Sequence, residues 1–443
     1  MQQAFLTVDL GFGDAGKGSI VDFLTRTYGA HTVIRYNGGA QAGHRVVTPA
    51  GPGMMQQEHV FAQFGAGTLA GAATHLSRFM LLDPLAMMAE EAHLQTLGIT
   101  DAFQRTTIDA RAVVITPFQR AVNRVREALR GAGRHGSCGM GIGETAADRL
   151  AHGDRVLLAG DLVDRDRLYT KLAFLRAVNL AKVHPYAAQI ADCAAAAAEM
   201  AWLADPDWEW LLAAYADFAA LAQFVPGSHL SALLARPGAV IFEGAQGVLL
   251  DEWFGFHPHT TWSTTTLANA EQLLAEASYP GNVTRIGITR AYATRHGAGP
   301  FVTEDATLTE ALPDACNGNG AWQQGFRVGW LDLMMVRYAL AAVGPLDYLA
   351  VTCLDRLAGL TEVKLCTHYH DDTGCWKQTR SAPTPHDLGY QAQLTHRLQR
   401  CRPHLQALPD CDALCTQLTG RLGVPTRLLS HGPTAAEKQL WPL

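Results

Sequence analysis

A short stretch near the N-terminus constrains this chain more than any other. Residues 5–10 are mostly strand-forming and apolar, the next nine residues contain four glycines, and residues 20–24 have apolar helical spacing. This order is typical of a strand, a phosphate-binding loop and a helix start. Glycines let the backbone approach an anion closely, and the start of a helix offers free N–H groups. The stretch therefore predicts an α/β fold that binds phosphate groups.

Two charged residues in this loop are candidates for chemistry. Residues 11–17 match the spacing G-x-x-x-x-G-K, in which Lys17 is a mobile cation, but Gly18 stands where the common loop has Ser or Thr to hold magnesium. A carboxylate among bound phosphates is repulsive unless it ligates a cation or takes a proton. We therefore expect Asp14 to hold the metal or accept a proton; the alternative is a glycine-rich turn with an incidental aspartate.

A second glycine-rich loop follows a second expected strand. Residues 32–36 are strand formers, and residues 37–44 contain three glycines and end in His44. Ligands of open α/β sheets lie at the carboxyl ends of the strands, so the two loops are expected to flank one site. A lone histidine is more often structural, but this position favours a functional role for His44.

Two later strand ends carry polar residues of interest. Gln246 follows the short strand at 239–242, and its amide is suited to reading the donors and acceptors of a heterocycle. Asp355 follows the strand expected at 346–352. It is either a helix cap or turn residue, or a carboxylate that accepts hydrogen bonds from a guanine base.

The remaining sequence predicts one large α/β domain over residues 1–443, with a large, mainly parallel central sheet flanked by helices and a mostly helical insertion at 145–236. The 48% of apolar residues suffices for a substantial core. We expect strands at 54–64 and 106–116, helices at 84–97 and 118–131, and a glycine-rich loop at 131–143 that either binds ligand or lies on the surface. A net charge of −6 without a long basic run argues against a nucleic-acid surface. With no expected leader or membrane span, we expect a cytoplasmic protein.

One group of histidines and cysteines has two interpretations. Cys366, His368, His370 and Cys375 are of the types that ligate zinc. Residues 361–370 alternate as a strand, however, and residues 371–374 form a good turn, so we favour a β-hairpin with exposed polar residues. The nine cysteines are unevenly spaced and odd in number, which argues against a disulfide framework.

Beyond these patterns, a series of ordered motifs resembles the adenylosuccinate synthetase family. The first is Gly-Asp-x-Gly-Lys-Gly at residues 13–18, followed by Arg-Tyr-x-Gly-Gly at 35–39 and Ala-Gly-His at 42–44. Further matches lie, in order, at residues 139–143, 242–247, 294–295, 297–304, 329–332, 362–366 and 432–433. The resemblance spans almost the whole chain.

The resemblance implies a Mg²⁺- and GTP-dependent ligase that joins IMP to L-aspartate through 6-phosphoryl-IMP, and a homodimer. Asp14 matches the base that takes the N1 proton of IMP and also a metal ligand, together with the carbonyl of Gly43. His44 matches the acid that stabilises charge on the transferring phosphoryl group. The implied nucleotide-binding residues are Gly13, Gly16, Lys17, Gly18, Gly43, Asp355, Gly432 and Pro433, and the implied substrate-binding residues are Gln41, Ser137, Cys138, Gln246, Thr261 and Arg327.

Several positions depart from the pattern of the family. Phe12, Ala15 and Ser19 replace Trp, Glu and Lys of the first loop; Ala40-Gln41 replaces His-Asn; Ser137-Cys138 replaces Thr-Thr; and Met140 replaces Arg. His152 stands where the family reaches an arginine across its dimer interface to the IMP phosphate, and Cys353 stands in place of the lysine of the guanine motif. Within the guanine motif, Asp355 alone therefore supports GTP as the triphosphate substrate, and ATP remains an alternative.

The largest departure lies in the loop that holds aspartate in the family. Residues 321–330 read AWQQGFRVGW, where the family has Thr-Thr-Gly-Arg and further arginines, so Arg327 alone remains of that cluster. Buried carboxylates need paired cations or several donors. Trp322 either covers a less acidic or larger donor or reflects a packing change. Three hypotheses follow: the usual ligase, a paralogue of the same mechanism with another amino donor or purine nucleotide, and a non-catalytic nucleotide-binding protein, which retention of Asp14 and His44 disfavours.

Overall fold

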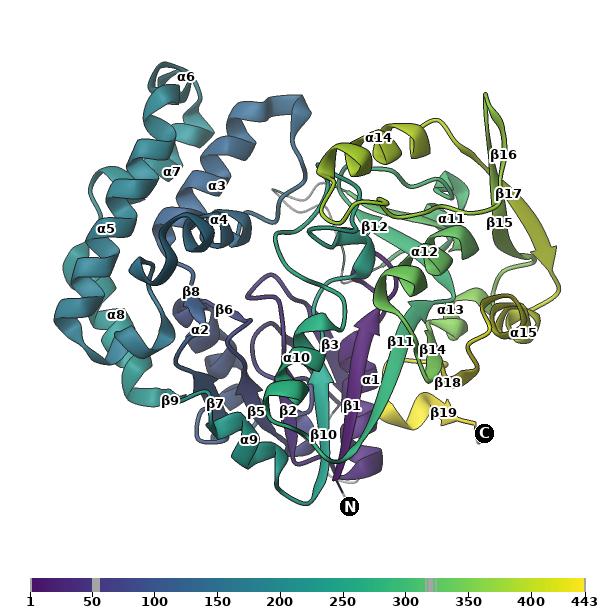
Figure 1. Cartoon of the computed structure of the whole chain (residues 1–443), viewed down its shortest axis with the longest axis horizontal. Coiled ribbons are helices and arrows are strands. Elements are labelled where there is room, and N and C mark those ends of the chain that lie inside the picture. Colours follow the sequence, from purple (N-terminus) through teal and green to yellow (C-terminus); the bar gives the residue numbers. More distant parts are fainter. Residues whose placement is uncertain (1, 50–55, 315–316, 318–321, 323–324, 442–443) are drawn as a thin grey trace.

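The computed structural model describes residues 2–49, 56–314, 317, 322 and 325–441. Its largest sheet contains β1 (Gln2–Asp9), β2 (Thr32–Arg35), β5 (Ala73–Leu76), β7 (Thr106–Asp109), β9 (Gln223–Val225), β10 (Gly238–Glu243), β11 (Asn282–Arg290), β14 (Tyr348–Thr352), β18 (Thr426–Ser430) and β19 (Lys438–Leu440). These strands lie in the order β19-β18-β14-β11-β1-β10-β2-β5-β7-β9 (Figure 1). Within the described residues, neighbouring strands are parallel except β18 and β19. The predicted α/β fold with a large, mainly parallel sheet is confirmed.

Strand β1 lies in the middle of this sheet because it is apolar on both faces. Leu6 and Val8 pack into one core cluster, whereas Phe5 packs into the other. A strand covered on both faces has this continuous apolar sequence instead of an alternating one. The loop after β1 therefore starts from the middle of the main sheet.

Helices cover both faces of the sheet and form a separate group at one side. The helices outside that group are α1 (Lys17–Tyr28), α2 (Pro84–Thr96), α9 (His229–Leu234), α10 (Ala268–Glu276), α11 (Ala306–Ala311), α12 (Leu333–Val343), α13 (Leu354–Leu357), α14 (Leu388–Leu398) and α15 (Cys411–Leu422). The group at the left of Figure 1 contains α3 (Pro117–Arg130), α4 (Ile142–His152), α5 (Arg165–Val183), α6 (Ala187–Ala191), α7 (Ala194–Ala204) and α8 (Trp208–Leu221). No helix of the described ranges combines the length and apolarity that a membrane span requires.

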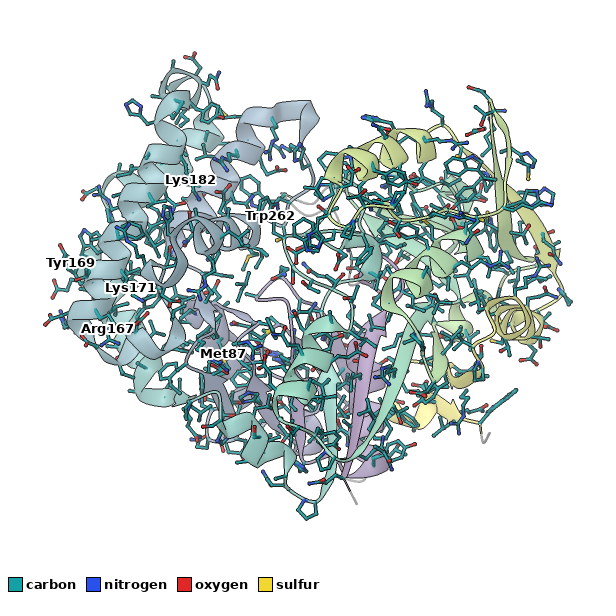
Figure 2. The ribbon with its side chains drawn as sticks, in the orientation of Figure 1. Met87, Arg167, Tyr169, Lys171, Lys182 and Trp262 are labelled. Atoms are coloured by element: carbon teal, nitrogen blue, oxygen red, sulfur yellow. The ribbon has the colours of Figure 1, made fainter. Side chains whose placement is uncertain are left out.

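The helical insertion is tied together by charge and returns to the main sheet. Lys182 on α5, labelled in Figure 2, pairs with Glu144 at 2.9 Å and Asp148 at 2.7 Å on α4. The insertion then ends in β9, which pairs with β7. The expected helical character of residues 145–236 is therefore observed, except that β9 belongs to the sheet.

The prediction of one strand over residues 106–116 is wrong. The segment forms β7 and the separate strand β8 (Val113–Val114), which pairs with β6 (Leu81–Leu82). Between them, Asp109 accepts the backbone N–H of Arg111 at 2.9 Å and pairs with its guanidinium, which turns the chain. In the region predicted as a strand at 54–64, β4 (Gln57–Phe61) pairs with β3 (His44–Thr48), and residues 54–55 lie outside the described residues.

A second, five-stranded sheet lies beside the first and was not anticipated. It contains β12 (Tyr292–His296), β13 (Phe326–Asp332), β15 (Val363–Asp371), β16 (Gly374–Trp376) and β17 (Arg402–Leu408). Strands β15 and β16 form a β-hairpin, which confirms the hairpin predicted from the strand at 361–370 and the turn at 371–374. The sheet packs at the right of Figure 1.

Asp332 joins this sheet to α12. Its carboxylate caps α12 by accepting the N–H groups of Met334 at 3.0 Å and Met335 at 3.3 Å, and it accepts the hydroxyl of Tyr369 on β15. Burial raises the pKa of Asp332 to about 7, although these hydrogen bonds oppose the shift. Below about pH 7, the protonated carboxyl is therefore the major form in the folded chain.

The raised pKa of Asp332 predicts a pH-dependent stability. The folded state binds this proton more tightly than the unfolded state, so the contribution is full at pH values below about 4 and is lost as pH rises through about 7. Asp332→Asn, which keeps the helix cap, should gain stability relative to wild type over this range, on the order of 1–3 kcal/mol. Urea unfolding of both proteins from pH 5 to pH 8 measures the difference, and a difference independent of pH would contradict the prediction.

Candidate active site

The loop after β1 is built around a buried ion pair. The Asp9 carboxylate accepts the N–H groups of Gly11 at 2.7 Å and Ala15 at 2.9 Å. It also pairs with the Lys17 ammonium at 2.8 Å, and that ammonium donates to the carbonyl of Gly13. An ammonium has three N–H groups, so two partners leave one donor for a ligand. Asp9 was not singled out in the sequence; its signal is its position as the last strand residue before the loop.

Gly18 owes its identity to packing. A Cβ on Gly18 would lie 2.7 Å from the carbonyl carbon of His44 and 2.9 Å from the carbonyl oxygen of Arg45. The start of β3 therefore passes directly against the start of α1. This contact brings the two glycine-rich loops together, as their positions in the sequence predicted.

Replacing Gly18 by alanine should displace β3 and with it His44. The obstructing atoms are backbone, so they cannot rotate away, and we expect a loss of about 1–3 kcal/mol of stability. Urea unfolding and calorimetric titration with GTP measure the two consequences. Gly420→Ala is the matched control. Gly420 lies inside helix α15, and a Cβ there would have no neighbouring atom of the described residues within 4 Å. Unchanged stability and GTP affinity in Gly18→Ala would contradict the close approach.

His44 is held by a carboxylate far away in the sequence. Its Nδ1 lies 2.5 Å from Oε1 of Glu243, the last residue of β10, and both side chains are buried. The second Glu243 oxygen accepts the N–H of Ala66 at 2.9 Å. Arg35, the register partner of Glu243 on β2, is also fully buried. Nε2 of His44 is buried and has no hydrogen-bond partner among the described residues, so it is available to a ligand.

Electrostatics keep this pair in a defined state. Burial lowers the pKa of His44 well below its ordinary value, against the opposing charge and hydrogen bond of Glu243. Burial also disfavours ionised Glu243, but the charge of Arg35 and the hydrogen bonds from His44 and Ala66 outweigh it and keep the pKa of Glu243 below its ordinary value. The result is a carboxylate beside a neutral imidazole whose protonation an incoming anion would favour.

The loop after β10 carries two side chains that were expected to act together. Gln246 donates through Nε2 to Oγ1 of Thr261 at 3.0 Å, and its Oε1 is buried without a partner among the described residues. The backbone of Gln246 has a φ of 62°, a conformation uncommon for a residue with a side chain and often found at functional sites. Gly247 packs on the first loop, since its Cβ would lie 2.2 Å from the carbonyl oxygen of Gly11.

Asp14 lies at the edge of the first loop and is partly exposed. Its Oδ2 is 3.5 Å from Nε2 of His296, the last residue of β12, and that nitrogen also lies 3.1 Å from Oδ1 of Asn317. Asp14 and Arg290 both line a cavity beside the loop. His296 is a candidate site residue that no pattern in the sequence had indicated.

The residues assigned to the nucleotide base lie around the end of β14. Thr352 donates to the carbonyl of Ala15 at 2.9 Å, which joins β14 to the first loop. Asp355 is exposed on α13, two residues after Cys353, whose φ is 58°. The Lys438 ammonium donates to the carbonyl of Gly432 at 3.1 Å and to that of Thr434 at 2.8 Å, beside Pro433.

Lys438 is a further cation that the sequence did not single out. Burial lowers its pKa to about 8, whereas Asp22 and Asp355 oppose the shift. Strand β18, which ends just before Gly432, pairs with β14, which ends just before Asp355, so the two segments leave neighbouring strands of the sheet.

The remaining substrate candidates in loops come from two segments of the chain. Both amide atoms of Gln41 are buried without a partner among the described residues, which suits a ligand contact. Ser137 donates to Oδ1 of Asn123 on α3 at 3.0 Å, and burial raises the pKa of the neighbouring Cys138 thiol. The loop at 131–143 approaches the glycine loop after β12, since a Cβ on Gly136 would lie 3.3 Å from the nitrogen of Ala298.

The helical insertion also meets the loop after β10. A Cβ on Gly143 would lie 3.3 Å from the ring of Trp262, which Figure 2 shows in the middle of the molecule beside this insertion.

Arg327 is already engaged within the protein. Its Nη1 donates to Glu304 at 2.7 Å, and its Nη2 donates to the carbonyls of Gly297 at 2.7 Å and Gly299 at 3.1 Å. Trp322 packs over Gly139 and lies 5.6 Å from the Arg124 guanidinium, a cation–π distance. Ala321, Gln323 and Gln324 of the expected donor loop lie outside the described residues.

Comparisons with known proteins point to one family. The model of a family described as adenylosuccinate synthetase matches residues 7–436. The chain is 30% identical to adenylosuccinate synthetase of Magnetococcus marinus over 96% of this chain and 95% of the relative. It is 33% identical to that of Salinibacter ruber over 91% of this chain and 86% of the relative.

Solved structures share the fold. A fully ligated adenylosuccinate synthetase from Plasmodium falciparum matches with a TM-score of 0.80 and 19% identity over 99% of both chains. Cyanophage S-2L succinoaminodeoxyadenylate synthetase, bound to dGMP and to dATP as an energy donor, matches with a TM-score of 0.60 and 14% identity over 100% of this chain and 96% of that one.

Proposed function

The chain belongs to the adenylosuccinate synthetase family and is a C–N bond-forming ligase, and we propose that it joins IMP to L-aspartate at the expense of GTP, giving adenylosuccinate, GDP and phosphate. The observation that carries the proposal is the buried His44–Glu243 pair on the loop that packs against the phosphate loop; Nε2 of His44 has no partner in the described part of the chain. A protein that only binds nucleotide needs no such pair.

The proposed reaction assigns separate tasks to Asp14 and His44. Asp14 takes the N1 proton of IMP, so the 6-oxygen gains the electron density to attack the γ-phosphate, and GDP leaves. His44, protonated beside the bound triphosphate and held by Glu243, donates from Nε2 to the transferring phosphoryl group. The amine of aspartate then attacks C6 and displaces phosphate. His296, 3.5 Å from Asp14, positions that carboxylate.

Magnesium is proposed as the cofactor because the donors present suit it. The Asp14 carboxylate is partly exposed, and the carbonyl of the exposed Gly43 precedes His44. Carboxylate and carbonyl oxygens are hard ligands, and Mg²⁺ completes its shell with phosphates and water. The ion would supply charge neutralisation for the phosphates.

Recognition of the purine nucleotide is assigned to amide groups. The side-chain amide of Gln41 and Oε1 of Gln246 are buried and have no partner in the part of the chain that the structure describes, so a ligand would satisfy them, as buried polar groups generally are satisfied. Thr261 orients Gln246 through their hydrogen bond. Asp355 is assigned to the guanine base, and Gly432 and Pro433 are assigned to positions beside that base. Lys17 and the glycines of its loop are assigned to the phosphates. The proposal also includes one domain over residues 1–443, a homodimer and a cytoplasmic location.

A second candidate is a paralogue with another amino donor or purine nucleotide. The observation that favours it is Arg327, whose two terminal nitrogens are occupied by Glu304 and two backbone carbonyls. Two substrate carboxylates would therefore have to displace these partners or find other donors. The cyanophage structure, which holds dGMP and dATP, illustrates the same fold with other nucleotides.

The test measures phosphate release from GTP in the presence of Mg²⁺ and IMP, with aspartate compared against other amino acids and amines. Further reactions replace IMP by dGMP or GTP by ATP, and the mass of each product is recorded. Aspartate-dependent adenylosuccinate at an ordinary enzymatic rate supports the main proposal. Turnover only with another donor or nucleotide supports the paralogue. No turnover in any arm, with nucleotide binding intact, would contradict both and leave a binding protein.

A further inference from the structure

Three metal-ligating side chains meet at the edge of the second sheet. His368 and His370 lie on β15 and Cys375 lies on β16, and one ligand atom from each is within 4.8 Å of the others. Figure 1 shows this hairpin at the periphery of the molecule, whereas β1 and the loop that follows it are central. The cluster is therefore separate from the candidate active site.

Strand pairing brings the three side chains together. His370 and Cys375 are register partners across the antiparallel hairpin, so their side chains lie on the same face. His368 precedes His370 by two residues, and alternate residues of a strand share a face. His370 and Cys375 are exposed and His368 is half-buried, so an ion can reach all three.

The turn of the hairpin is fixed by groups other than the cluster. Asp371 accepts the N–H of Thr373 at 2.8 Å and its hydroxyl at 2.6 Å. The other Asp371 oxygen accepts Nε of Arg397 at 2.8 Å. The ligands are therefore held near one another by the fold itself, which lowers the entropic cost of collecting them.

A bulge explains why three residues, and not the four seen in the sequence, form the cluster. The register of β15 with β17 shifts between Cys366 and His368. Cys366 is consequently fully buried, and its thiol donates to the carbonyl of His368 at 3.5 Å. The shift leaves Tyr369 buried and His368 and His370 facing outward.

We propose that His368, His370 and Cys375 form a site for a divalent transition-metal ion of the Zn²⁺ type. Two imidazoles and a thiolate are ligands that suit zinc and do not suit Mg²⁺. Tetrahedral Zn²⁺ needs ligand atoms roughly 3.3–3.6 Å apart. Side-chain rotations that move the ligand atoms by about 1 Å would therefore bring the three groups to this spacing. Three protein ligands leave the fourth position to water, and the ion links β16, three residues long, to β15.

The first test is a titration of the untagged, EDTA-treated full chain with Co²⁺, followed by displacement with Zn²⁺. We expect one ion per chain with a thiolate-to-cobalt charge-transfer band, unaffected by excess Mg²⁺. Cys375→Ser should abolish the band, and Cys375→Ser and His370→Ala should each weaken Zn²⁺ binding at least tenfold. Absence of the band, or its persistence in Cys375→Ser, would overturn the proposal.

Matched variants separate this site from others. Cys193→Ser and His396→Ala replace one residue of each type outside the hairpin and should retain the band and the affinity. Asp14→Asn should also retain them, which distinguishes this site from a metal at the phosphate loop. Circular dichroism in EDTA checks that Cys375→Ser and His370→Ala still fold, as expected for exposed positions.

Hydrogen exchange gives a readout independent of spectroscopy. With Zn²⁺ bound, amides of residues 370–376 should exchange at least tenfold more slowly, because a metal that joins both strands opposes opening of the hairpin. The effect should be absent in Cys375→Ser. Equal slowing in wild type and Cys375→Ser would show binding elsewhere and overturn the assignment.

Discussion

Asp14→Asn is expected to abolish turnover while nucleotide binding persists. Asparagine keeps the size of the side chain but cannot accept the N1 proton, and loss of a positioned acid or base costs roughly 10²–10⁴ in rate. The Asp9–Lys17 pair, which holds the loop, does not involve this side chain. Steady-state phosphate release and calorimetric titration with GTP in the absence of Mg²⁺ therefore measure two separable quantities, of which the first falls and the second changes little.

A matched control for Asp14→Asn lies on the helical insertion. Asp217 is exposed on α8, and Asp217→Asn should leave phosphate release at the wild-type rate. If Asp14→Asn retained more than about a tenth of the wild-type kcat, another group would be the base, and the assignment would be wrong.

His44→Gln should lower kcat by roughly 10³-fold, because it removes the proposed donor to the transferring phosphoryl group. The neutral amide can still occupy the buried space beside Glu243, so the free energy of unfolding should change little compared with the loss in rate. His59→Gln is the control: His59 is a buried histidine on β4, the partner strand of β3, with His93 as its hydrogen-bond partner. A comparable loss of kcat in both variants would show that the effect is structural.

Glu243→Gln should change the pH dependence of kcat in a way that damage to packing would not. The charge and hydrogen bond of Glu243 raise the pKa of His44 against burial, so their removal lowers that pKa further. His44 acts as an acid, so activity is lost as pH rises through the His44 pKa of the complex. The alkaline limb of the kcat profile should therefore move to lower pH, with kcat at neutral pH about 10²-fold lower. An unshifted limb would exclude Glu243 as the group that tunes His44.

Local sequence patterns predicted well those helices, strands and turns that are formed by residues close together in the chain. The strand, glycine loop and helix at residues 5–24, the helix at 84–97 and the hairpin with its turn at 371–374 all formed as expected. Each depends on hydrophobic period, capping and turn residues within a few positions of one another. The same reasoning failed at residues 106–116, because the Asp109–Arg111 pair turns a chain whose apolar pattern continues.

The sequence by itself therefore determined the fold class, the two loops at strand ends and the candidacy of Asp14 and His44, since these follow from short-range patterns and strand geometry. Only the tertiary structure decided which groups those residues meet. Glu243 is 199 residues from His44, and their contact arises because β10 pairs with β2, beside the loops. Gly18 likewise became intelligible only when β3 was seen against it. Such contacts depend on strand order, which hydrophobic period does not encode because every buried strand presents the same apolar pattern.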